Sequence, residues 1–105
     1  MLIAYIAGPY RANTEWGVEQ NIAKAEAVAL KYWKLGYAVI CPHKNTAHFG
    51  GAMPDETWLE GDIEIMKRCD VVVMSQGWED SVGSVVEHRI AINLGIKIIY
   101  DFDWL

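Results

Sequence analysis

The stretch Ser81-Val82-Gly83-Ser84-Val85-Val86-Glu87 decides the fold. It follows the apolar run Val71-Val72-Val73-Met74 and leads into an apolar-periodic segment, residues 90–94. This order predicts a buried strand, a loop of small residues and a helix. A helix start offers unpaired N–H groups and a positive dipole end, so it suits a phosphate. We expect Glu87 in the first helical turn, beside that ligand, although small residues and a Glu are equally typical of simple capping.

The rest of the chain repeats the alternation of strand and helix. Apolar runs, helical periodicity and Gly or Pro boundaries predict strands over residues 2–7, 37–41, 71–75 and 96–100, and helices over 15–35, 56–68 and 83–94. We expect Asp55 to cap the second helix, after a loop over 43–55. The pattern predicts one doubly wound, flavodoxin- or Rossmann-like three-layer α/β domain over residues 1–105, with four or five parallel strands.

Composition excludes several classes of protein. The formal net charge of −5 argues against binding a nucleic-acid polymer, which needs a basic face. No apolar run approaches the roughly 20 residues that span a bilayer, and the first residues read as a strand and not as a signal peptide. Two cysteines, Cys41 and Cys69, are too few for a disulfide scaffold. We therefore expect a reduced, soluble, cytoplasmic protein with no membrane partner.

Ligands of parallel sheets bind at the carboxyl ends of the strands, so the loops there hold the candidate residues. Gly8-Pro9-Tyr10-Arg11 follows the first strand, and its Arg suits a phosphate, or it is a turn with a solvated Arg. Tyr5 is either packed on a helix or bonded to a carboxylate. Asp62 borders the apolar face of its helix, as a solvated residue or as an active-site group.

Other polar and aromatic residues have simpler interpretations. Cys41, His43 and His48 lack a fourth ligand at a usual spacing, so we expect no metal, and no cofactor either. His43 would line the ligand pocket or pack locally, and His88 would lie at the surface or an interface. We expect Trp33 in the core, on the same helix face as Val18. Trp104 suggests a tail that docks on something.

Five segments, which together span nearly the whole chain, resemble the nucleoside 2-deoxyribosyltransferase-like superfamily, in family order. They are Tyr5-Ile6-Ala7-Gly8-Pro9-Tyr10, Asn21-Ile22, Cys41-Pro42-His43, Gly61-Asp62 with Cys69-Asp70-Val71, and Gly77-Trp78 through Glu87. The chain looks closest to a small bacterial and phage branch that is related to the deoxynucleoside 5′-monophosphate N-glycosidases.

The resemblance implies roles for individual residues. Glu87 would attack the anomeric carbon, Tyr5 would orient Glu87, and Asp62 would act as acid–base near the leaving base. The phosphate would be held by the loop after the first strand, with Arg11, and by Ser81, Gly83 and Ser84. Transferase members have Asp at the Ser81 position, so Ser favours a 5′-monophosphate over a free nucleoside. The five tryptophans and the apolar C-terminal tail predict a homo-oligomer, at least a dimer, through the helices after the second and third strands. The resemblance supports this, because family members often complete the site from a neighbouring subunit.

Two other functions remain open at this point. A non-catalytic nucleotide-binding module is one, because Ser84 and Val85 replace the small residues that usually precede the Glu. A nucleoside-monophosphate phosphoribohydrolase of the cytokinin-activating kind is the other, although the chain lacks the Pro-Gly-Gly that opens the loop of those enzymes. The leading hypothesis is a nucleotide N-glycosidase or deoxyribosyltransferase-like enzyme.

Overall fold

Four parallel strands form one sheet in the order β2-β1-β3-β4. The computed structural model describes residues 1–102, so the expectation for Trp104 lies outside the described residues. The elements are β1 (Ile3–Ala7), α1 (Glu15–Lys34), β2 (Ala38–Ile40), α2 (Pro42–Asn45), α3 (Asp55–Met66), β3 (Val71–Ser75), the 3-10 turn η1 (Trp78–Asp80), α4 (Val82–Asn93) and β4 (Lys97–Asp101).

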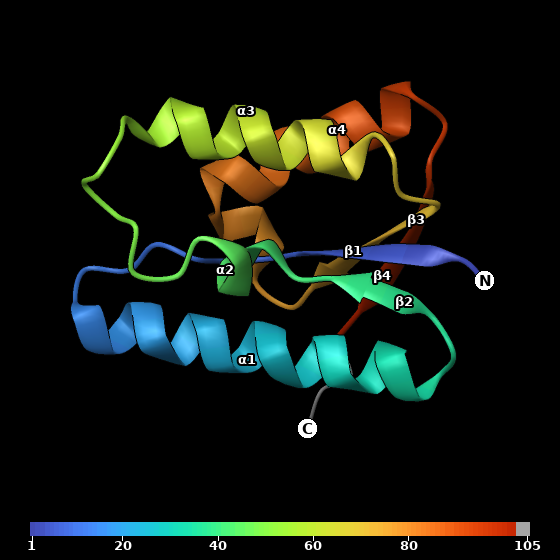
Figure 1. Ribbon diagram of the computed structural model, residues 1–105, viewed down its shortest axis with the longest axis horizontal. Coiled ribbons are helices and arrows are strands. Elements are labelled where there is room, and N and C mark those ends of the chain that lie inside the picture. Colours follow the sequence, from blue (N-terminus) through green and yellow to red (C-terminus); the bar gives the residue numbers. More distant parts are fainter. Residues whose placement is uncertain (103–105) are drawn as a thin grey trace.

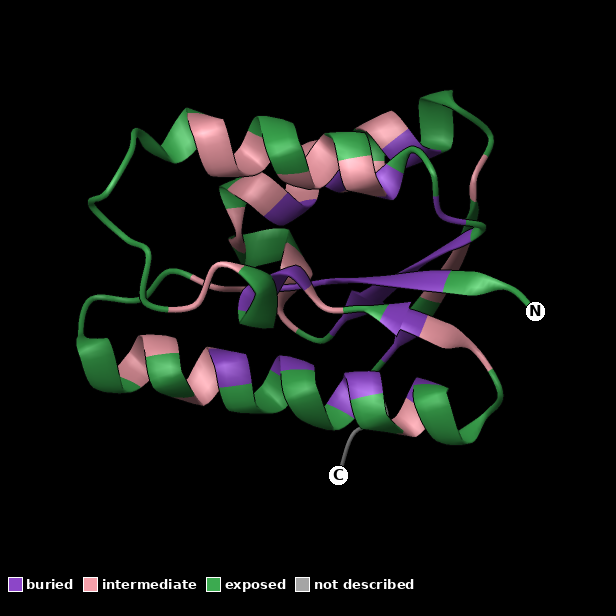
Figure 2. Cartoon of the chain, in the orientation of Figure 1, coloured by how far each residue is buried: buried purple, intermediate pink, exposed green. Residues whose placement is uncertain are grey.

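The helices cover both faces of the sheet, as Figure 1 shows. Alternate residues of a strand point to opposite faces. Ala4 and Ile6 of β1 therefore pack in the cluster that includes α1, whereas Tyr5 and Ala7 join the cluster with residues of α3 and α4. All five residues of β3 are buried, since helices lie on both sides of it. Figure 2 shows this buried layer between helices whose outer faces are exposed.

This arrangement confirms the predicted doubly wound, flavodoxin-like α/β fold with a four-stranded parallel sheet. The chain runs from β1 outward to β2 on one side, and from β3 outward to β4 on the other. The direction of winding therefore switches between β1 and β3. Loops that follow these two strands diverge at this point and leave room for a ligand.

Three local predictions were wrong. Trp33 is 53% exposed, because Tyr32 takes the buried position in the last turn of α1 and Trp33 projects at the edge of the buried face. Asp55 is not the cap of α3 but its first residue, after Pro54 with extended backbone. Glu87 is the sixth residue of α4, in its second turn, because the helix already begins at Val82 after the Ser81 cap.

The region predicted as a loop between β2 and α3 contains a short helix. Pro42 occupies the first position of α2, where its missing N–H costs nothing and its fixed φ favours the helix. This turn buries His43 beneath the loop that follows β1. The helix therefore places a residue of the β2 connection next to the switch point.

Candidate active site

Tyr5 and Glu87 meet in the buried layer between the sheet and α4. The phenol of Tyr5 donates a hydrogen bond to Glu87 Oε2, although 82 residues separate the two in sequence. Glu87 is only 7% exposed and Tyr5 is fully buried. The contact arises because Tyr5 faces the α4 side of β1, and Glu87 faces the sheet together with Ala91, four residues further along α4.

Burial perturbs both groups of this pair. Loss of hydration raises the pKa of Glu87 to about 7, the charge of Asp62 adds to this rise, and the hydrogen bond from Tyr5 opposes it. The pKa of Tyr5 is raised strongly, first by burial and then by the charge of Glu87. Tyr5 therefore remains a protonated donor, and Glu87 changes its charge near neutral pH.

Asp62 on α3 supplies a second carboxyl group to the same region. Its side chain is half-buried, and burial raises its pKa to about 6. Its charge acts on both Tyr5 and Glu87. Both carboxyl groups therefore titrate close to neutral pH, so each of them can be ionised or protonated there.

The loop after β1 is tightly built. Gly8 packs so close to Ser75 that a Cβ at this position would collide with the Ser75 hydroxyl, which donates to the Ala7 carbonyl at 3.0 Å. Asn21 of α1 donates from Nδ2 to the carbonyls of Tyr10 and Arg11, at 3.1 and 3.3 Å. The loop backbone is thus held from both β3 and α1. The sequence analysis had assigned no role to Asn21.

His43 lies against the same loop. Its Nε2 donates to the Pro9 carbonyl at 2.8 Å, and the ring of Tyr10 meets its ring edge-on at a centroid distance of 5.7 Å. Burial lowers the pKa of His43, so the ring is neutral at pH 7. The neutral ring fastens Pro9 and Tyr10 to α2.

Three residues at the start of α4 were expected to hold a phosphate, and each has a different environment. The hydroxyl of Ser81 caps the helix and accepts from the Ser84 N–H at 3.3 Å. Gly83 faces Leu59 of α3, with room for a Cβ at ordinary contact distance. Ser84 is 1% exposed, and its hydroxyl has no hydrogen-bond partner among the residues that the structure describes.

Arg11 lies at the surface, in the loop between β1 and α1. Its guanidinium forms an ion pair with Asp55 at the start of α3, and both side chains are mainly exposed. The sequence pattern did not predict this partner, because an Asp before a helix is typical of a cap. Asp55 lies in the first turn of a helix that begins near the strand ends, and this position could have indicated that it lies close to the loop with Arg11.

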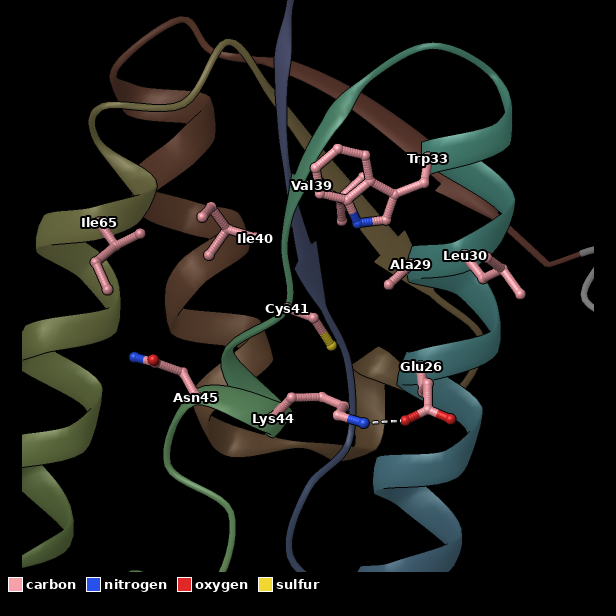
Figure 3. Close-up of a pocket in the computed structure, with 10 residues that line it drawn as sticks. All are labelled: Glu26, Ala29, Leu30, Trp33, Val39, Ile40, Cys41, Lys44, Asn45 and Ile65. Carbon is pink, nitrogen blue, oxygen red and sulfur yellow. Dashed lines mark hydrogen bonds and ion pairs between the residues drawn. The ribbon is translucent and has the colours of Figure 1, made fainter.

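Two hollows lie near the strands. One, of about 330 Å³, opens at the switch point on the α1 side and is lined by Pro9, Asn21, Lys24, Ala25, Val28, Ser75, Gln76, Gly77 and Asp80. The other is a groove of about 710 Å³ along the free edge of β2, where Leu30, Trp33 and Ile40 lie exposed (Figure 3). Neither of these two hollows is lined by Tyr5, Asp62 or Glu87.

His88 belongs to an aromatic cluster beside the site and not to the carboxyl pair. Its ring stacks on Trp78 at 4.3 Å, and its Nε2 bonds the Tyr100 hydroxyl at 2.7 Å.

Within residues 1–102, no three His, Cys, Asp or Glu side chains are grouped so that they could hold a metal ion. None of the described helices is both long and apolar enough to cross a membrane.

Comparisons with known proteins agree on the fold. A 2-deoxyribosyltransferase from the psychrotolerant bacterium Bacillus psychrosaccharolyticus aligns with a TM-score of 0.66 and 20% identity, over 97% of this chain and 87% of that chain. A 2-deoxyribosyltransferase from Leishmania mexicana aligns with a TM-score of 0.68 and 17% identity, over 95% of this chain and 63% of that chain. This chain thus spans less than two thirds of the Leishmania protein.

Comparison of the sequence identifies the family of the chain. No curated protein matches it. A family described as "Domain of unknown function (DUF4406)" matches residues 2–100. The chain therefore belongs to the DUF4406 family.

Proposed function

We propose that this protein cleaves the N-glycosidic bond of a nucleoside or deoxynucleoside 5′-monophosphate, with Glu87 as nucleophile. The observation that carries the proposal is the hydrogen bond from Tyr5 to a buried Glu87, with Asp62 close enough to shift the pKa of both. The solved neighbours described as 2-deoxyribosyltransferases support a sugar-transfer reaction on this fold.

The reaction follows from the two carboxyl groups. Glu87, as a carboxylate, forms a bond to the anomeric carbon while the bond from that carbon to the base nitrogen breaks. Asp62, as an acid, gives its proton to the departing base. Water then attacks the glycosyl-enzyme and loses a proton to Asp62, which yields the sugar phosphate. If a second base attacks in place of water, the product is a new nucleotide.

The phosphate subsite is proposed from three features at the carboxyl edge. The N-terminus of α4 offers N–H groups and a positive dipole end. Ser81 and Gly83 keep that end free of bulky side chains. The backbone of Gly8, Pro9 and Tyr10, which contacts His43, would form the other wall. Arg11 adds a cation at the outer side. The side chain of Ser84 is buried and its N–H donates to the Ser81 hydroxyl, so Ser84 would reach a phosphate only by exchanging that hydrogen bond.

A direct assay tests this proposal. The purified protein is incubated with a panel of ribo- and deoxyribonucleoside 5′-monophosphates and the matching free nucleosides, and released base is quantified by chromatography. We expect base from at least one monophosphate, and less or none from its nucleoside. Glu87→Gln should abolish release, while Glu79→Gln, a matched change at an exposed residue, should not. Ligand binding without release of base would favour the non-catalytic nucleotide-binding module.

We also propose a homo-oligomer in the cytoplasm. The groove along β2 leaves Leu30, Trp33 and Ile40 exposed beside a strand whose outer edge pairs with no other strand among residues 1–102. This is a typical protein-interaction surface. Cys41 and Cys69 are both free thiols, which fits a reducing compartment.

A further inference from the structure

The ion pair between Arg11 and Asp55 joins two segments on either side of the proposed phosphate subsite. Arg11 comes from the loop after β1, and Asp55 is the first residue of α3. Figure 1 shows this loop and the start of α3 at the same end of the molecule, where β1 ends. The side chains are 69% and 61% exposed, so a ligand can reach either one.

The neighbours of this pair place it beside the start of α4. Leu59 lies one turn after Asp55 on α3, and its Cδ1 is 3.8 Å from where a Cβ on Gly83 would lie. Asn21 fixes the carbonyls of Tyr10 and Arg11, so the base of the Arg11 side chain has a defined position. The guanidinium therefore links the loop after β1 to α3, one helical turn before Leu59, the residue that lies against Gly83 of α4.

The carboxylate of Asp55 is thus an anionic partner for Arg11 within the same chain. A guanidinium binds carboxylate and phosphate with the same kind of N–H donor, and an N–H that donates to Asp55 is not available to a phosphate. We propose that Asp55 is a specificity-determining residue that competes with the substrate phosphate for Arg11. A phosphate dianion carries more charge than the carboxylate and displaces it, whereas a free nucleoside leaves the pair closed. This inference rests on the proposed function.

If Asp55 competes with the phosphate, the affinity of the protein for a nucleoside 5′-monophosphate should increase when the Asp55 carboxylate is replaced by a neutral amide. Exposed ion pairs contribute little, so Asp55→Asn should tighten binding of a nucleoside 5′-monophosphate by only about two- to fivefold. Binding of the matching nucleoside should not change. Once Arg11 is absent, Asp55→Asn should have no further effect on the monophosphate.

The experiment is calorimetric titration of the full chain in a Glu87→Gln background, which prevents turnover. The titrants are a nucleoside 5′-monophosphate that the base-release assay identifies and its nucleoside. Glu56→Gln is the matched control, since it removes the same charge from the next residue of α3, which is also exposed. The proposal requires tightening with Asp55→Asn, little with Glu56→Gln, and none for Asp55→Asn on an Arg11→Gln chain.

The outcomes separate the two proposals. Unchanged or weaker monophosphate binding by Asp55→Asn overturns the competition and leaves the proposed function standing. Equal tightening by Glu56→Gln also overturns it, because the effect would then be general electrostatics. If no monophosphate binds to any variant, the proposed function fails and the competition fails with it.

Discussion

Glu87 is a carboxylate that the fold removes from water and that Tyr5 holds by one hydrogen bond. Removal from water is unfavourable for the charged form, as the raised pKa of Glu87 shows. A carboxylate with few hydrogen bonds keeps its lone pairs available, which suits a nucleophile. The same residue therefore weakens the folded state at high pH and provides the proposed chemistry.

Glu87→Gln should stabilise the protein at alkaline pH. The folded-state pKa of Glu87, about 7, lies above the unfolded value of 4.5, so the folded state binds the proton more tightly. That contribution to stability is complete below about pH 4.5 and is lost as the pH rises through about 7. At pH 8 the variant should gain up to about 3 kcal/mol in the free energy of unfolding. At pH 4 it should gain almost nothing.

Urea unfolding at pH 4 and pH 8 measures this difference. Glu79→Gln is the control and should show no comparable dependence on pH, because Glu79 is exposed. Equal stability of Glu87→Gln and the unmodified protein at pH 8 would mean that Glu87 is hydrated in solution.

Tyr5→Phe should move the pH dependence of catalysis. The hydrogen bond from Tyr5 lowers the pKa of Glu87, so its loss raises that pKa further. The acid limb of the rate profile, where Glu87 must ionise, should shift to higher pH, and the rate at pH 7 should fall by about 10- to 100-fold. A pH–rate profile of base release tests this, and a lower rate with an unmoved acid limb would contradict it.

The ends of β1 and β3 pack so closely that there is no space for a side chain at Gly8. Gly8→Ala places a Cβ against the Ser75 hydroxyl and should destabilise the protein by about 1–3 kcal/mol. Gly61→Ala is the matched control: Gly61 lies inside α3 with open space around it, so the change should stabilise by about 0.5–1 kcal/mol. Urea unfolding of both variants measures the two effects.

Ser75→Ala gives a direct check of the cause. On a Gly8→Ala chain it removes the colliding oxygen, so part of the lost stability should return. The same change on the unmodified chain should only destabilise, since it removes the hydrogen bond to the Ala7 carbonyl. If the two effects simply add, the collision is not the reason.

The sequence predicted the strands and helices well because their signals are local. Apolar runs and glycines such as Gly36, with φ of 98°, mark the ends of elements whatever lies around them. Trp33 was misplaced because periodicity cannot tell which residue at the border of an apolar face is covered. That depends on the position of β2, which is an edge strand in the part of the chain that the structure describes.

Local sequence patterns predicted less of the candidate site than of the strands and helices. No local pattern connects Tyr5 with Glu87, and that pair came from the family resemblance. The partner of Arg11 is 44 positions away and is set by how α3 crosses the sheet. Loop lengths and packing decide such contacts, and neither can be read from residue spacing.

The groove beside β2 is lined largely by apolar side chains, and this surface is where we expect the oligomer to form (Figure 3). Trp33→Glu should shift the protein toward monomer, because it puts a charge into a surface that is buried on association. Trp16→Glu is the control on the same helix, since Trp16 is 73% exposed and does not line the groove. Light scattering at micromolar concentration tests this, and a monomeric unmodified protein would contradict it.

The proposed reaction depends on a covalent bond between Glu87 and the sugar. Fluorine at the 2′ position destabilises the oxocarbenium-like transition state, so a 2′-fluoro nucleoside 5′-monophosphate should leave a long-lived glycosyl-enzyme. Mass spectrometry of the digested protein should then show the fluorinated sugar phosphate on the peptide that contains Glu87, and none on Glu87→Gln. An adduct on another residue, or base release with no adduct on Glu87, would contradict the account.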